Sequence, residues 1–263
     1  MSERRLEAIV LAGDRGPGDP LSVGHGVPGK VLVPVEGRPL LAHVLDAVCD
    51  CPVVGTVAVA APDRPGFAEL LAQRPSVRRV APADGPAASV QRALEALEGR
   101  RPVLVVTGDH PLLRAGWLEE FADRAAATGA DAVVGVVSHA LVQQAFPGSK
   151  RTRYRFRDLQ VCGTNLFYLS DRAAADVAAV WRGFEADRKR PWRILRRLGP
   201  GVLFRYLLGR LDLDAAMRAL SRRIGVEVRA VVLEWPEAAV DVDSPADLEL
   251  VRDRMRRRNA ESS

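Results

Sequence analysis

Three observations in the sequence predict an α/β fold in which helices cover both faces of a mostly parallel sheet. Short apolar runs alternate along the chain with amphipathic runs of helical length. The apolar runs are nearly continuous, which is typical of strands buried on both faces. The strongest of them, RPVLVVTGDHPLL (101–113), stops at Gly108-Asp109. Together these patterns predict a three-layer α/β/α sandwich.

The first half of the chain supplies most of the elements of this sandwich. Strands are expected where apolar runs are bounded by turn residues, at 7–13, 53–62, 76–82, 101–113 and 130–138. Helices are expected where apolar residues recur at helical spacing, at 39–50, 67–74, 86–99 and 115–129. Pro39 favours the start of the first helix, and Gly99 favours the end of the third.

The rhythm changes after Ser138. A period of two predicts a half-exposed strand whose cationic face carries Arg151, Arg153, Arg155 and Arg157. A helix is expected at about 171–184, and 187–225 predicts a basic amphipathic helical stretch broken at 199–201. The chain then returns to a strand at 226–236.

A closing helix is expected after this last strand. Ser244 is a natural N-cap, and Asp247 lies three residues on, which is close to a capping box. The helix is expected to end near residue 258, and the last residues, 259–263, are expected to be disordered.

Composition narrows the class of protein. No apolar stretch approaches the roughly 20 residues needed to cross a bilayer. The first residues lack the apolar region of a signal peptide, and an odd number of cysteines (Cys49, Cys51 and Cys162) favours free thiols, so a cytoplasmic location is expected. The net charge of +5 reflects arginine-rich usage throughout, and no nucleic-acid-binding motif accompanies it. We therefore expect no nucleic-acid partner.

Three polar features are expected at the carboxyl ends of strands, where open α/β sheets bind ligands. The first is a glycine-rich loop from Gly13 to Lys30, suited to phosphate, with one of only three lysines in the chain. The second is Asp109. The third is the pair Asp241 and Asp243, which would point the same way from a strand and could serve a divalent cation such as Mg²⁺. The loop is not a Walker motif, because Val31 follows Lys30.

Four segments, in this order, carry a resemblance to a known superfamily: LAGDRGPG…PGKVLVPVEGRPLLAHVL, DGPAASVQRALEAL, VVTGDHPLL and AVDVDSPADLELV. The chain resembles the MobA-like nucleotidyltransferases, that is, molybdenum-cofactor guanylyltransferase and its sugar-phosphate and methylerythritol-phosphate relatives. The resemblance implies a Rossmann-like, GT-A-like fold with a mostly parallel mixed sheet. It spans about 10–250, so we expect one domain over 1–258, with an acceptor-side insertion at about 140–225.

The resemblance also implies roles for individual residues. The nucleotide would be bound by Leu11, Ala12, Gly13, Gly16, Gly85 and Ser89. The catalytic residues would be Arg15 and Lys30, which hold the phosphates, and Asp109. The metal ligands would be Asp109 and Asp243. Asn165 would face the acceptor. Independently of the resemblance, the arginine row with Arg153 and Arg155 could be a solvated face or could grip an anionic acceptor. In this sequence Gly13 is followed directly by Asp14-Arg15-Gly16, where relatives usually place a small residue before Arg-Met-Gly.

The implied reaction is transfer of a nucleoside monophosphate from an NTP, with GTP or CTP favoured, to a phosphorylated small molecule, with release of pyrophosphate. The second pKa of a phosphate monoester is near ~6, so the acceptor needs no general base at neutral pH. What the reaction needs is in-line positioning and neutralised charge, which Mg²⁺, Lys30 and Arg15 would supply.

Other interpretations stay open. The chain could be a GT-A-type glycosyltransferase, since DVD at 241–243 fits its metal motif, or a catalytically inactive nucleotide-binding protein. Asp109, Asp243 and Ser89 could simply cap helices or turns, and Asp241 could be structural. The stretch 187–225 could pack as helices, form a homodimer, touch the substrate or lie on an anionic membrane.

Overall fold

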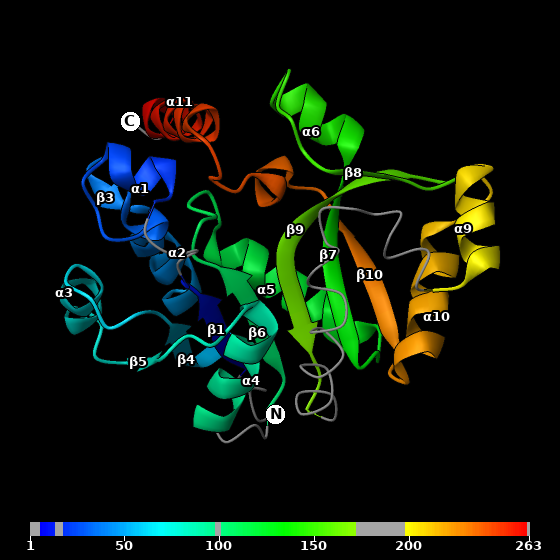
Figure 1. Ribbon diagram of the computed structural model, residues 1–263, viewed down its shortest axis with the longest axis horizontal. Coiled ribbons are helices and arrows are strands. Elements are labelled where there is room, and N and C mark those ends of the chain that lie inside the picture. The colour runs from blue at the N-terminus through cyan, green and yellow to red at the C-terminus, as the bar shows by residue number, and fades with distance from the viewer. Residues whose placement is uncertain (1–5, 14–17, 98–100, 172–197, 262–263) are drawn as a thin grey trace.

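The structure, a computed structural model, describes residues 6–13, 18–97, 101–171 and 198–261. Within these residues, eight strands form one sheet in the order β10-β7-β9-β6-β1-β4-β5, with β8 paired to β9 at one side. Helices lie around this twisted sheet, with α3 near one end and α9 and α10 near the other (Figure 1). The predicted three-layer α/β fold is confirmed.

The first half of the sheet is parallel. β1 (Leu6–Leu11) lies between β4 (Val54–Ala60) and β6 (Val103–Thr107), and β5 (Val77–Val80) extends the sheet beyond β4. Because these strands are parallel, their carboxyl ends lie at one edge. This edge is where the site forms.

Strand β1 shows why both faces must be covered. Ala8 and Val10 belong to one apolar cluster, which includes residues of α2 (Leu40–Cys49) and α5 (Ala115–Ala127). Ile9 belongs to the opposite cluster, with residues of α4 (Pro86–Ala96). Successive side chains of a strand point to opposite faces, so an apolar strand of this kind requires a helical layer on each side.

The glycine-rich segment after β1 contains regular structure. Asp19 caps the short helix α1 (Pro20–Gly24), and Lys30 opens the 3-10 helix η1 (Lys30–Leu32). A small hairpin of β2 (Pro34–Val35) and β3 (Arg38–Pro39) leads into α2, while α3 (Phe67–Ala72) joins β4 to β5. Lys30 therefore sits on an ordered turn.

The second half of the sheet is mixed. β7 (Ala132–Ser138) and β10 (Val228–Leu233) are parallel, whereas β9 (Gln160–Leu169) runs antiparallel between β6 and β7. The segment expected as an insertion at 140–225 thus includes a central strand. It also includes α6 (His139–Ala145) at its start, then α9 (Pro200–Leu207) and α10 (Leu213–Ile224).

The predicted arginine strand at 151–157 is wrong in its extent. Only β8 (Arg153–Arg155) is a strand, and it pairs with β9 as a hairpin whose turn is closed by a bond from Phe156 N–H to Leu159 O. Arg151 lies outside this short strand. Its side chain is buried against Asp241, so the arginines share no single solvated face. The helix expected at 171–184 and the stretch 187–197 lie outside the described residues.

Two predictions near the carboxyl end also need correction. The 3-10 helix η2 (Pro236–Ala239) follows β10, and residues 240–243 are not a strand, so Asp241 and Asp243 project from a loop. Helix α11 (Pro245–Glu261) includes residues 259–261, which were expected to be disordered. Within the described ranges, none of the helices has the length and apolar character needed to span a membrane.

Candidate functional site

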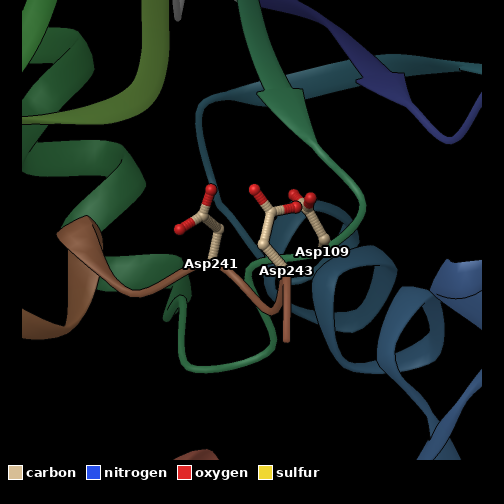
Figure 2. Close-up of side chains that lie close together, drawn as sticks. All are labelled: Asp109, Asp241 and Asp243. Carbon is tan, nitrogen blue, oxygen red and sulfur yellow. The ribbon is translucent and has the colours of Figure 1, made fainter. Parts of the chain in front are cut away.

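Three carboxylates gather where the sequence predicted two. Asp109 follows β6, while Asp241 and Asp243 lie on the acid loop, which we define as residues 240–244. One oxygen from each carboxylate lies within 4.8 Å of the others, and the three side chains point into a common space (Figure 2). A bond of 3.0 Å from Val242 N–H to Asp109 O fixes the acid loop against the end of β6.

Lys30 bridges two of these carboxylates. Its Nζ donates to Asp109 Oδ2 and to Asp243 Oδ1, both at 2.6 Å. The lysine side chain is only 11% exposed. Thr107 Oγ1 donates to the other oxygen of Asp109 at 2.6 Å. The structure therefore brings together the cation and the two metal ligands that the sequence predicted.

Electrostatics keep both members of this bridge charged. Burial alone would raise the pKa of Asp109, but the charge of Lys30 and the hydrogen bonds from Lys30 and Thr107 outweigh it and lower the pKa to about 2. Burial would lower the pKa of Lys30, but Asp109 and Asp243 raise it overall. At neutral pH the bridge is therefore an ion pair.

Gly108 allows Asp109 to reach this place. A Cβ atom at Gly108 would lie 3.0 Å from Leu41 Cδ1 and 3.4 Å from Leu11 O, because the chain passes close to the end of β1. Gly108 N–H also donates to Leu11 O at 2.8 Å. The ends of β1 and β6 are thus held side by side, and a larger residue at Gly108 would crowd the Leu41 side chain.

A second cation, Arg151, holds the third carboxylate. Its Nη1 donates to Asp241 Oδ1 at 2.7 Å, and its Nη2 donates to Asp247 Oδ1 at 2.7 Å. Asp247 in turn accepts from Asp243 N–H at 3.2 Å and from Ser244 Oγ at 2.6 Å. Ser244 accepts from Asp247 N–H at 3.2 Å, so the predicted cap is confirmed.

This network is rich in carboxylates. Among the described residues, the four carboxylates of Asp109, Asp241, Asp243 and Asp247 surround Lys30 and Arg151. Carboxylate oxygens are the ligands that hard divalent cations prefer. The residues present therefore fit a divalent metal ion.

A cavity of about 150 Å³ opens beside the carboxylates on the side of the β8–β9 hairpin. Its walls include Tyr154, Cys162, Asn165 and Asp243. Asn165 has a left-handed backbone (φ 52°) where the pairing of β9 with β7 shifts register, and its amide donates to His110 Nε2 at 3.1 Å. The bulge thus turns the Asn165 amide toward the cavity, where its predicted role in acceptor binding stays a prediction.

The described residues among those predicted to bind the nucleotide lie along the same edge. A Cβ atom at Gly13 would lie 3.7 Å from Pro82 Cβ, so the end of β1 approaches the segment before α4. Gly85 precedes α4 with φ 114°, and Ala12 is completely buried. Ser89 is buried too, and its hydroxyl accepts from Ala83 N–H at 2.9 Å. This bond favours a structural role for Ser89, in which it supports the loop before α4.

The structure separates other predicted residues from the cavity. Arg153 and Arg155 belong to β8 but are not among the residues that line it. Arg15 and Gly16 lie outside the described residues. Sequence reasoning left Arg151 among solvated arginines, because its partners are 90 and 96 residues away.

Comparisons with known proteins agree with this geometry. The family described as the MobA-like NTP transferase domain matches residues 8–202. A structure titled as a hypothetical transferase from Thermus thermophilus is 35% identical, with a TM-score of 0.77, and the match covers 93% of this chain and 99% of that one.

Two further matches are either shorter or lower in identity. The bifunctional protein GlmU of Paraburkholderia xenovorans is 38% identical over 112 residues, which is 38% of this chain but only 22% of that protein. The structure of CMP:2-keto-3-deoxy-manno-octonic acid synthetase complexed with CTP is 14% identical, with a TM-score of 0.62 and coverage of 97% and 99%. At this identity the likeness shows the fold alone.

Proposed function

Because the chain belongs to the MobA-like NTP transferase domain family, we propose that it transfers a nucleoside monophosphate from an NTP to a phosphorylated small molecule and releases pyrophosphate. The observation that carries the proposal is the meeting of Lys30, Asp109 and Asp243 at 2.6 Å, from parts of the chain up to 213 residues apart. Each of these residues was expected in the site for its charge, and together they form one network.

The proposed metal is Mg²⁺, held by Asp109 and Asp243. When bound, Mg²⁺ would neutralise charge on the reacting phosphates. The close approach of carboxylate oxygens from Asp109, Asp241 and Asp243, all within 4.8 Å of one another, supports a divalent ion.

Lys30 has the chemistry to receive the nucleotide phosphates. A lysine ammonium is a compact point charge that binds phosphate well. The two carboxylates keep it protonated and hold it at the carboxyl ends of β1 and β6. We propose that Lys30 neutralises the departing pyrophosphate, and that the chain supplies no general base because the acceptor phosphate is already ionised.

The cavity beside Asn165 is the proposed acceptor site. It borders Asp243 and lies on the side of the β8–β9 hairpin. Arg153 and Arg155 lie on the same hairpin and could meet an anionic acceptor that extends beyond the cavity. GTP or CTP as the donor, and a cytoplasmic location, stay predictions.

Pyrophosphate release tests the proposal directly. The purified chain is incubated with each of ATP, GTP, CTP and UTP and a panel of phosphorylated sugars and polyols, with Mg²⁺ or with EDTA. We expect one NTP to yield pyrophosphate only with Mg²⁺ and an acceptor. Release of a nucleoside diphosphate from a nucleotide sugar would favour the glycosyltransferase. Thermal stabilisation by an NTP without turnover on any acceptor would favour the inactive binding protein.

We also propose that α9 is a contact surface. Phe204, Leu207 and Leu208 are 64%, 70% and 50% exposed, and the exposed Arg205 and Arg210 flank them. Exposed apolar groups beside arginines suit an anionic membrane or a second copy of the chain. Cosedimentation with anionic vesicles and light scattering distinguish a membrane contact from a homodimer. A monomer that ignores vesicles would contradict the proposal.

A further inference from the structure

The side chain of Arg151 is among the most buried charged groups beside the site. It is only 7% exposed, and its two terminal nitrogens end on different carboxylates, Asp241 and Asp247. The Nη1 atom also donates to the backbone oxygen of Asp241 at 3.0 Å. An arginine fork held at three oxygens has little freedom to turn toward a substrate.

The partners of Arg151 lie on both sides of the metal ligand Asp243. Asp241 precedes it by two residues on the acid loop. Asp247 follows it on the first turn of α11 and accepts from its N–H at 3.2 Å. Arg151 therefore fixes the acid loop at both ends of the short segment that carries Asp243.

Arg151 also connects this loop to the acceptor side. It lies two residues before β8, and both Arg151 and Asp243 line the cavity beside Asn165. Its positive charge offsets one carboxylate close to the metal ligands. Without it, Asp241 and Asp247 would be two uncompensated, partly buried charges that repel Asp243.

From these contacts we propose that Arg151 is a positioning residue that sets Asp243 for the metal ion. The inference rests on the proposed function, because it assumes that Asp243 is a metal ligand. The sequence alone did not distinguish Arg151 from the other arginines of the alternating row at 151–157, and the inference gives Arg151 a role of its own. Arg151 acts on Asp243 through Asp241 and Asp247.

The test measures metal affinity without turnover. Mn²⁺ binding to the chain with saturating NTP and no acceptor is followed by electron paramagnetic resonance, in the wild type, Arg151→Met and Arg151→Lys. We expect Arg151→Met to weaken Mn²⁺ binding at least tenfold. Arg151→Lys keeps the charge but loses the fork, so its loss should be intermediate.

The matched control is Arg74→Met. Arg74 is 15% exposed and donates to Asp46 at 2.6 Å, in an ion pair between α2 and the turn after α3, outside the site. Removing it should lower the melting temperature but leave Mn²⁺ affinity within twofold of the wild type. If Arg151→Met does not fold, Arg151→Lys decides the matter.

Each outcome has a distinct meaning. Mn²⁺ affinity within twofold of the wild type in a folded Arg151 variant would overturn the positioning task while leaving the proposed function intact. A wild type that binds no Mn²⁺ with any NTP and releases no pyrophosphate would overturn both. Metal affinity lost in the Arg151 variants and kept in the control would support the inference.

Discussion

Two cations hold the carboxylates of the site, and they hold them differently. Lys30 places a single nitrogen 2.6 Å from both Asp109 and Asp243. Arg151 divides two nitrogens between Asp241 and Asp247, with a further bond to the backbone. A lysine ammonium that makes single contacts can exchange its carboxylate partners for another anion, whereas an arginine guanidinium that makes several bonds keeps its partners in place. We infer that Lys30 is the cation that substrates engage and that Arg151 is part of the frame.

The largest expected effect tests the Lys30 half of this comparison. Asp109→Asn removes the charge that Lys30 and the metal share, while the amide fills the same space. We expect pyrophosphate release to fall about 10³-fold, because charge stabilisation carries this reaction. Turnover is measured beside a circular-dichroism melting curve, which should show an intact fold. Turnover within tenfold of the wild type would remove Asp109 from the mechanism.

Lys30→Met should cost about 10²-fold in turnover. It should also raise the pKa of Asp109 from about 2, since the charge of Lys30 is a main cause of the low value. Nuclear magnetic resonance of the labelled carboxyl carbon checks the pKa. An Asp109 pKa that stays near 2 in Lys30→Met would mean that Lys30 is not what keeps the Asp109 carboxylate ionised.

The pH dependence of stability sharpens the same half. The folded-state pKa of Asp109 is about 2, below its usual 3.8, so its ionised form stabilises the folded protein above about pH 4. That contribution, about 2 kcal/mol at 1.36 kcal/mol per pKa unit, is lost as the pH falls from 4 to 2. Urea unfolding at several pH values should show this loss in the wild type. Asp109→Asn should lack it, and equal losses in both would contradict the assignment.

The smallest expected effect tests the Arg151 half. Ser244→Ala removes the cap that orients Asp247, and N-cap losses cost about 1 kcal/mol. Urea unfolding measures the change. Because Arg151 still holds Asp247, we expect Arg151→Met to destabilise the protein more. A larger loss in Ser244→Ala would mean that the cap, and not the arginine, is the main support of the acid loop.

The sequence predicted the parallel half of the molecule well. A continuous apolar run that ends in polar residues is a local pattern, so the sequence alone locates the carboxyl ends of β1 and β6. The resemblance then supplied the family, and the structure brings Lys30, Asp109 and Asp243 together. Their catalytic and metal-binding roles stay predictions.

The acceptor half was harder because its order depends on distant contacts. Alternating arginines indicated one strand, but Arg151 is drawn inward by carboxylates 90 and 96 residues away. The acid loop was expected at the end of a strand, yet η2 intervenes and releases it from the sheet. No local pattern carries this information.

The left-handed backbone at Asn165 limits which residues can replace it during evolution. Its φ of 52° is a conformation that asparagine, aspartate and glycine adopt far more readily than other residues. Only a few residue types can therefore replace Asn165 without straining the backbone of the bulge. Changes in what the neighbouring cavity accepts would have to arise at other wall positions, such as Tyr154 and Cys162, whose backbones carry no such restriction.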